Sequence, residues 1–514
     1  KNIFFPSAYS VAYADVYDIA TKKQSLKKWE IELGLPHKEM DLDWDSPVPD
    51  ELDDKVFEYC ENDVRATEAV WNHISSDISA REMLAEWANM PICTKTNTLT
   101  AAIIFDGNHK NAKSCLKWRD LSKPVKKWET SAMQDFLQKE CGRFVEPFDE
   151  ESLLPYFPGY IFDKEMRKST YRGFEVGEGG FVYAEPGYYE NVALLDIESM
   201  HPNSFIDECY AGVNYTRRFR DILQLRVLIK HKRYEEASQL FDGIFAKHLK
   251  DKASAKALSF ALKIAINSVY GLTSARFENP FYNPLNVDNI VAKRGALFMI
   301  DLLDYVQQDL GCQVAHIKTD SIKIPNADND TIAKVMEFGK KYGYNFVHEA
   351  TYAKMCLVND AVYVAKYQTD DWCQERYGYI PEDNADYPGQ WTATGTQFQV
   401  PYVFKTLCTH EPIIFDDMCE TKSVTTAIYI DMGHDDIHDY QFVGRVGRFT
   451  PVKTGGGILL RKSGPDKFSA VNGTKGYRWL ESTDAKGLPM SEIDESTTVK
   501  LTFDGCPSVT MDPG

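Results

Sequence analysis

The sequence predicts a mixed α/β (α+β) protein, and three observations carry this prediction. Apolar residues recur at helical spacing within residues 51–78 and again within residues 216–271. Short apolar runs typical of strands occur at 181–183 and 192–197. Residues 313–324 contain two apolar runs around a polar turn, which is the pattern of an antiparallel hairpin. Helix-forming and strand-forming stretches are therefore grouped along the chain.

The helical stretches are recognised by apolar stripes, and a further helix is expected at about 288–309. Residues 88–150 are Lys-rich, show few periodic signals and are predicted to be a connector. A glycine block at 177–180 precedes the first strand, and the chain from about 376 onward mixes aromatic, Gly and basic residues. The stripes consist of Val56, Tyr59, Cys60, Val64 and Val70, then Ile222, Leu225 and Ile229, and finally Leu258, Ala261, Leu262, Ala265 and Val269.

The length and composition are those of a multidomain protein without a membrane segment. A chain of 514 residues exceeds what one core usually supports. No apolar run reaches the roughly 18 residues of a membrane span. The eleven cysteines stand singly, without the spacing of a zinc site or a disulfide framework, which favours a reduced, cytoplasmic protein. The chain starts Lys-Asn-Ile-Phe-Phe, without Met or a signal pattern, so we expect a longer parent protein.

The formal net charge of −18 at pH 7 argues weakly against a nucleic-acid enzyme. Binding depends on local patches more than on net charge, however. Acidic residues are concentrated between 41 and 63, whereas basic residues are concentrated between 217 and 233 with only Asp221 opposing them. The basic residues are Arg217, Arg218, Arg220, Arg226, Lys230, Lys232 and Arg233.

Three short blocks carry the predicted chemistry. Residues 196–202 (Asp-Ile-Glu-Ser-Met-His-Pro) follow an apolar run, so Asp196 is expected at a strand end, with Pro202 preventing further ladder pairing. Residues 263–271 (Lys-Ile-Ala-Ile-Asn-Ser-Val-Tyr-Gly) place positions 263, 267 and 270 on one helix face. Asp320 lies in the turn of the predicted hairpin.

These residue types suit phosphoryl transfer to a primer hydroxyl. Such a reaction uses two divalent ions about 3.5–4 Å apart. Carboxylates on neighbouring strand ends can hold magnesium, whose other ligands are waters and substrate phosphates. Lys263 on one helix, and Arg226 and Lys230 four residues apart on the preceding helix, can contact a triphosphate.

The three blocks resemble motifs A, B and C of family B DNA polymerases, which run Asp-x-x-Ser-Leu-Tyr-Pro, Lys-x-x-x-Asn-Ser-x-Tyr-Gly and Asp-Thr-Asp-Ser. The block at 263–271 matches motif B completely, and the separations suit the family. Residues 286–295 and 473–479 look like bacteriophage-type members, and the glycine block is similar to the motif that joins the exonuclease and polymerase modules. The resemblance covers about residue 50 to the end.

The resemblance implies a DNA-directed DNA polymerase that extends a primer in DNA replication, viral DNA replication for a bacteriophage-type member. Its partners would be primer-template DNA, deoxynucleoside triphosphates and two Mg²⁺ ions, in the cytoplasm (of the host cell if the protein is viral). Asp196 and Asp320 would be catalytic and bind the metal ions, with the carbonyl of Ile197 assisting. The residues implied to bind nucleotide are Arg226, Lys230, Lys263, Asn267, His201, Tyr270 and Gly271.

The implied architecture is a right-hand polymerase with an antiparallel-sheet palm, helical fingers and thumb, plus a remnant of the 3′–5′ exonuclease domain. Basic residues of the C-terminal stretch, including Arg445 and Arg461, would hold duplex phosphates. The domains implied are an exonuclease remnant at 1–90, a connector at 91–150, the palm at 151–215 and 272–375, the fingers at 216–271, and the thumb and C-terminal region at 376–514.

The sequence departs from the family pattern at three places. Lys318 stands where motif C usually has its first Asp, and His201 where motif A has a Tyr that blocks a ribose 2′-hydroxyl. Tyr59 and Asp63 resemble the third exonuclease motif, but its partner Asp-x-Glu motif is not found in residues 1–58. We therefore expect no proofreading by this chain unless a separate or missing N-terminal segment completes the exonuclease site.

Other interpretations of the same residues remain open. Each block taken alone is more typical of a solvated helix face, a cap or a turn. Residues 196–198 form an Asp-x-Glu, which could open a 3′–5′ exonuclease site, although they follow Asp63 instead of preceding it. Lys318 and the incomplete N-terminus also fit a catalytically inactive polymerase remnant that still binds DNA.

Overall fold

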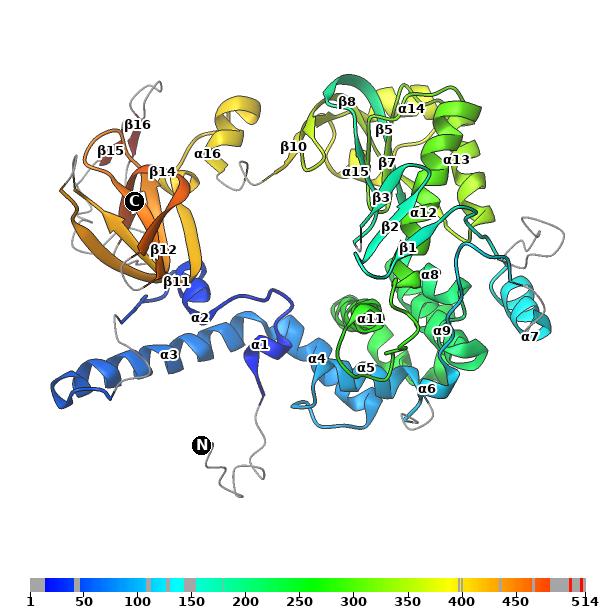
Figure 1. The fold of residues 1–514 in the computed structure, drawn as a ribbon, viewed down its shortest axis with the longest axis horizontal. Helices are drawn as coiled ribbons and strands as arrows, with labels where there is room; N and C mark the ends of the chain where they lie inside the picture. Colours follow the sequence, from blue (N-terminus) through cyan, green and yellow to red (C-terminus); the bar gives the residue numbers. More distant parts are fainter. Residues whose placement is uncertain are drawn as a thin grey trace. The chain divides into compact units, whose positions relative to one another are not determined.

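A computed structural model describes most of the chain, and it contains helices and antiparallel sheets, as the sequence predicts (Figure 1). The chain divides into two compact units. Unit 1 is Ser79–Gly395, and unit 2 is Ala14–Ile78 with the described residues beyond 396. Residues 1–5 and the start of the acidic stretch 41–63, residues 41–46, fall outside the described part. The structure describes residues 14–40, 47–107, 112–125, 130–142, 154–177, 179–395, 398, 401–433, 437–464, 467–480, 499–501 and 509–511.

Unit 1 is built on a seven-stranded sheet in which every neighbouring pair is antiparallel. The predicted strands and the hairpin are confirmed, with the hairpin strands shifted by a few residues. In spatial order the strands are β10 (Trp391–Thr394), β9 (Val362–Tyr367), β8 (Phe346–Asn359), β5 (Gly187–Ile197), β7 (Ser321–Pro325), β6 (His316–Lys318) and β4 (Val182–Ala184).

The two faces of this sheet differ, because side chains alternate along each strand. On β5, Ala193, Leu195 and Ile197 belong to the large core of unit 1. Val192 and Leu194 belong to a smaller cluster on the other face. Asp196 continues the second series, so the face opposite the large core carries the aspartate.

Helices cover the large-core face. Every residue of α12 from Ile290 to Leu303 is buried. The other described helices near the sheet are α8 (Met200–Asp207), α13 (Asn329–Lys341), α14 (Asp370–Tyr377) and α15 (Glu382–Asp386), with α12 (Ile290–Asp304) continuing as a π-helical turn at Tyr305–Asp309. A small separate sheet contains β1 (Ile161–Asp163), β2 (Lys168–Tyr171) and β3 (Phe174–Val176).

The predicted helical region 216–271 forms two long helices, α9 (Gly212–Lys230) and α11 (Lys252–Ser274), which pack against each other and against α5 (Thr96–Ile104) (Figure 1). Asp251 caps α11 by accepting a hydrogen bond from the backbone N–H of Ser254. Shorter turns join α9 to α11, namely α10 (Tyr234–Ala237) and the 3₁₀ turns Leu240–Gly243 and Ala246–Leu249.

The stretch 88–150, predicted as a connector, differs from expectation because it contains helices. Residues Leu99–Ile104 of α5 are all buried, so the helix has no polar face and lacks the amphipathic period by which helices are recognised. The helices before and within this stretch are α4 (Ser75–Ala88), α6 (Ala112–Cys115), α7 (Thr130–Asp135) and a π-helical turn at Phe136–Glu140.

Unit 2 combines N-terminal helices with a closed four-stranded antiparallel barrel in the order β11-β12-β14-β13. Ile428, Phe449 and Leu459 are among its buried core residues. The elements are α1 (Val16–Ile19), α2 (Leu26–Glu32), a 3₁₀ turn at Asp50–Leu52, α3 (Asp53–His73), α16 (Pro401–Phe404), turns at Lys405–Thr409 and Phe415–Met418, β11 (Glu420–Asp431), β12 (Tyr440–Pro451), β13 (Gly457–Gly464), β14 (Lys467–Leu480), and a strand pair β15 (Val499–Leu501) and β16 (Val509–Met511).

None of the helices in the described part of the chain has the length and apolar character that crossing a membrane requires.

Candidate active site

The first and third blocks meet at one end of the unit 1 sheet. Asp196 of β5 lies opposite Ser321 of β7 in the ladder. The backbone N–H of Ile197 donates to the backbone carbonyl of Asp320 at 2.9 Å. The two predicted aspartates, 124 positions apart in sequence, are thus neighbours at adjacent strand ends. The antiparallel register of β5 and β7 thus brings the first and third blocks together.

The turn that carries Asp320 is held from both sides. Thr319 has a left-handed backbone (φ 58°), and its N–H donates to the carbonyl of Phe181 at 2.9 Å. Gly180 (φ 131°) approaches the turn so closely that a Cβ there would lie 2.9 Å from Cγ2 of Thr319. The predicted glycine block therefore packs against the Asp320 turn, although Glu178 within it lies outside the described residues.

After Asp196 the chain enters α8. Ser199 takes a left-handed conformation (φ 59°), and the helix starts at Met200. Pro202 therefore sits in the first helical turn, where a missing backbone N–H is tolerated, and does not simply terminate the strand.

The carboxylates at this end of the sheet repel one another. Burial, together with the charges of Asp320 and Glu349, raises the pKa of Asp196 to about 8, while Lys323 and Lys230 oppose the shift. Burial also raises the pKa of Asp320 and of Glu349. Three partly buried carboxyl groups therefore give this end of the sheet a negative electrostatic potential.

Glu349 and Lys323 are site residues that the sequence reasoning missed. On β8, His348 lies opposite Leu195 but Ala350 lies opposite Leu194, so Glu349 is the extra residue of a β-bulge. Nothing in the local sequence marks a bulge. Lys323 is 3% exposed, and its position inside an apolar strand, between Ile322 and Ile324, was the one signal that could have identified it.

Lys323 lies beneath the carboxylate cluster on the same sheet face. Its ammonium is 5.2 Å from the ring centroid of Tyr363 and 3.5 Å from Oγ of Ser321. Burial lowers the pKa of Lys323 to about 8, and Asp196, Glu349 and Asp320 oppose this. Lys318, by contrast, is exposed.

The two predicted nucleotide-binding cations of α9, Arg226 and Lys230, differ in how far their side chains are buried. Lys230 is exposed, and its charge acts on both Asp196 and Glu349. Arg226 is half-buried, burial lowers the pKa of its guanidinium, and Glu198 opposes the shift. The buried Nε of Arg226 has no hydrogen-bond partner within the described residues. An anion placed beside Arg226 would satisfy that donor.

On α11 the second block presents an open face. Lys263, Asn267 and Gly271 are exposed, and no hydrogen bond or ion pair with a described residue joins Lys263 or Asn267 to the carboxylates. His201 of α8 stacks on Tyr270 with ring centroids 4.1 Å apart and an interplanar angle of 5°. The structure thus brings His201 and Tyr270 together, while Lys263 and Asn267 face solvent.

His201 is held as a neutral imidazole. Burial lowers its pKa to about 4, and its buried Nδ1 has no partner within the described residues. Stacking on Tyr270 fixes the ring plane.

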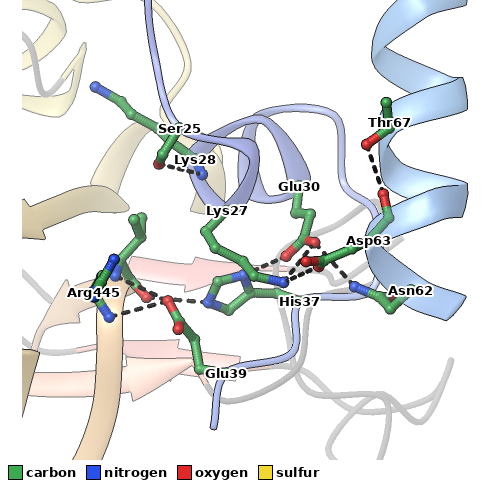
Figure 2. Close-up of polar contacts among 11 residues, drawn as sticks. Ser25, Lys27, Lys28, Glu30, His37, Glu39, Asn62, Asp63, Thr67 and Arg445 are labelled. Atoms are coloured by element: carbon green, nitrogen blue, oxygen red, sulfur yellow. Dashed lines mark hydrogen bonds and ion pairs between the residues drawn. The ribbon is translucent and has the colours of Figure 1, made fainter. Parts of the chain in front are cut away.

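Tyr59 and Asp63 lie on α3 in unit 2, where both contact Lys27. Figure 2 shows the contact between Lys27 and Asp63. The Lys27 ammonium is 2.5 Å from Oδ1 of Asp63 and 4.2 Å from the Tyr59 ring centroid, and it also pairs with the buried Glu30 at 3.0 Å. The structure therefore brings the two predicted exonuclease-motif residues together around a lysine.

Metal binding depends on the donor set. Across the described ranges, no group of three or more His, Cys, Asp and Glu side chains is arranged to hold a metal ion. The pair Asp196 and Asp320 nevertheless fits magnesium, which is commonly bound through one or two carboxylates with waters and phosphates completing its shell. The mutual repulsion of these carboxylates is what a divalent cation would relieve.

Comparisons with known proteins identify no family for this chain. No family model matches it, and no curated protein matches it. Among solved structures, it is similar to a family B DNA polymerase from the hyperthermophilic archaeon Pyrobaculum calidifontis, at 12% identity and a TM-score of 0.36. The match covers 94% of this chain and 60% of that one, so the chain spans less than two thirds of the matched structure. A similarity this low carries no argument about activity, which has to rest on the residues themselves.

Proposed function

We propose that this protein is a DNA-directed DNA polymerase of the family B type, which extends a primer 3′-hydroxyl with deoxynucleoside triphosphates in DNA replication. One observation carries the proposal: Asp196 and Asp320, from separate motif-like blocks, are neighbours at adjacent strand ends. Two carboxylates at adjacent strand ends are the donors that a two-metal phosphoryl-transfer site needs.

In this proposal Asp196 and Asp320 hold the metal ions, and the carbonyl of Ile197 is a further ligand. Two magnesium ions, when bound, favour ionisation of the primer hydroxyl and neutralise charge on the triphosphate and pyrophosphate. Glu349 adds negative charge to the site, and Lys323 limits the repulsion from beneath. Burial of these groups strengthens their electrostatic effect.

The helical part of unit 1 would bind the nucleotide. Arg226, Lys230 and Lys263 bind the triphosphate, with Asn267 beside them on α11. The orphan Nε of Arg226 supports an anion at that position. The stacked rings of His201 and Tyr270 contact the sugar and the nascent base pair. Gly271 has no side chain that would obstruct them.

The test is primer extension with Mg²⁺ and deoxynucleotides, comparing the parent with Asp320→Asn. Asp309→Asn is the matched control, because Asp309 is exposed and outside the site. Extension by the parent and the control, but not by Asp320→Asn, is expected. Equal extension by all three would refute the assignment of Asp320.

A second candidate is an inactive DNA-binding remnant, which Lys318 in place of an aspartate favours. Such a protein binds primer-template yet incorporates no nucleotide at any magnesium concentration. The exonuclease alternative predicts shortening of the primer in the absence of nucleotides. Primer extension with and without nucleotides therefore distinguishes the polymerase, the inactive remnant and the exonuclease.

A further inference from the structure

In unit 2 the segment that follows α2, residues 33–40, is attached to the barrel through a buried histidine. The His37 side chain is 6% exposed, and its Nδ1 lies 2.9 Å from Oε2 of Glu30 (Figure 2). Its Nε2 lies 3.1 Å from the carbonyl oxygen of Val446. A carboxylate and a carbonyl are both acceptors, so the ring can bond both only when each nitrogen carries a proton. The geometry therefore corresponds to a charged imidazolium.

Glu30 is bound as a carboxylate. Its side chain is fully buried, and Oε1 accepts hydrogen bonds from Nζ of Lys27 and Nδ2 of Asn62, both at 3.0 Å. Donors and a positive charge beside a carboxyl group stabilise its ionised form. The proton between Glu30 and His37 therefore belongs to the histidine.

Glu39 completes the attachment at an irregular part of the barrel, where the ladder between β11 and β12 is interrupted at residues 423–428. The backbone N–H groups of Arg445 and Val446 donate to Oε1 of Glu39 at 3.0 and 3.3 Å. Gly444 has φ 115°, and a Cβ there would overlap Cγ of Glu39. The segment after α2 is thus fitted closely to the backbone of β12.

The charges around the ring make the attachment sensitive to its proton. Burial raises the pKa of Glu39, and the charge of His37 lowers it. Loss of the His37 proton would leave an excess of negative charge and one acceptor without its donor. The charged and titratable groups of this network are Lys27 and Glu30 of α2, Glu39 of the same segment, Tyr59 and Asp63 of α3, and Arg445 of β12.

We propose that His37 is a pH-sensitive latch, which holds residues 33–40 on the barrel while its imidazole is protonated and releases them as the pH rises. An ordinary imidazole changes charge near pH ~6.5, so closing the latch takes up a proton at neutral and higher pH. By linkage, rising pH favours the open form.

Opening of the latch affects more than the barrel contact. Glu30 also binds Lys27, which in turn contacts Asp63 and Tyr59, so the state of His37 reaches these two residues of α3. The latch goes beyond the proposed polymerase activity, because it belongs to the unit that does not contain the candidate active site.

The test is hydrogen exchange of the backbone amides in residues 440–451, which include the two N–H groups bound by Glu39. Exchange of the full chain is followed from about pH 6 to about pH 8.5 and expressed relative to the unfolded chain at each pH. The relative rate should rise about 10- to 100-fold over this range, which corresponds to the loss of a hydrogen bond to a charged group. A relative rate that does not change with pH would overturn the proposal.

Two variants distinguish a latch from a purely structural contact. Glu30→Gln keeps the oxygen that binds Lys27 and Asn62 but supplies an amide donor, which a neutral His37 can accept at Nδ1 while Nε2–H still donates to Val446. This variant should stay closed, with a change below about 3-fold over the pH range. His37→Gln has no titrating ring and should exchange at the parent's high-pH rate throughout.

His73→Gln is the matched control, because His73 is exposed on α3 and should leave the parental profile unchanged. A parental profile in Glu30→Gln or in His37→Gln would refute the latch. Thermal unfolding at pH ~6 checks that the variants fold, and the comparison of the parent with Glu30→Gln decides the matter even where His37→Gln does not fold. Primer extension plays no part in this readout, so failure of the polymerase assignment would leave the latch untouched.

Discussion

Gly180→Ala is expected to disable the site through the turn that carries Asp320. The backbone of Gly180 has φ 131°, which L-residues with side chains rarely adopt. Its Cβ would lie 2.9 Å from Cγ2 and 3.2 Å from Cα of Thr319. Thr319 cannot easily retreat, because its N–H is bonded to the carbonyl of Phe181.

The expected magnitude follows from these contacts. Backbone strain of this kind costs of the order of 1–3 kcal/mol, and relieving the overlap requires the turn to move by several tenths of an ångström. A misplacement of about 1 Å at a reacting centre costs about 100-fold in rate. We therefore expect Gly180→Ala to lower the free energy of unfolding by about 2–3 kcal/mol and to reduce kcat for extension by about 10- to 100-fold.

The neighbouring glycine supplies the control. A Cβ at Gly179 would meet nothing within 4 Å, and its φ lies outside the range that side chains disfavour. Gly179→Ala should change the free energy of unfolding by less than about 0.5 kcal/mol and leave extension intact. Urea unfolding and single-nucleotide extension on both variants decide the matter. Equal behaviour of the two variants would refute the claim that the glycine block positions Asp320.

Three further predictions concern the nucleotide face, the core and acid stability. Lys263→Ala should raise KM for deoxynucleotides about 10- to 100-fold with unchanged DNA binding, while Lys256→Ala, also exposed on α11, should not; equal KM values would remove Lys263 from the triphosphate site. Arg294→Leu should cost about 3–5 kcal/mol in urea unfolding, because it removes a fully buried guanidinium from the buried carboxylates of Asp207 and Glu208, of which Glu208 keeps Arg119; a loss below about 1 kcal/mol would contradict this. Burial lowers the pKa of His316 and His348 to about 4 from the usual 6.5, so the unfolded chain binds more protons between these values. Each histidine should destabilise the fold by up to about 3 kcal/mol as the pH falls from 6.5 toward 4, while the raised pKa of Asp196 acts in the opposite direction. The difference in unfolding midpoint between the parent and a His316→Gln, His348→Gln variant should therefore change over this pH range, and parallel profiles would contradict the prediction.

The sequence predicted those helices and strands whose pattern of apolar and polar residues lies within the element itself. The strand that ends at Asp196 and the hairpin around Asp320 are marked by apolar runs and a polar turn, and both are present. The helix with Lys263 and Asn267 has a polar face opposite an apolar stripe, which is also local information. The roles of these residues remain predictions, since the geometry alone does not report chemistry.

The rest depends on contacts that no window of sequence contains. Glu349 enters the site because a bulge shifts its register, and α5 shows no helical period because it is buried on all sides. The association of residues 14–78 with the barrel rests on bonds such as that between His37 and Val446, which are 409 positions apart. The predicted boundary of the exonuclease remnant at residue 90 rests on a resemblance, which contains no such contacts.

The register of the central strands links the core to the candidate site. Leu195 lies opposite Ile322 and Ala193 opposite Ile324, and all four belong to the large core. A slip of one residue would turn Ile322 toward the other face and force Lys323 into that core, which is far too costly. Burial of these apolar residues therefore fixes which residues share the opposite face, and Asp196 is among them. The proximity of the two aspartates is thus a consequence of core packing, so the position of the site is as robust as the fold.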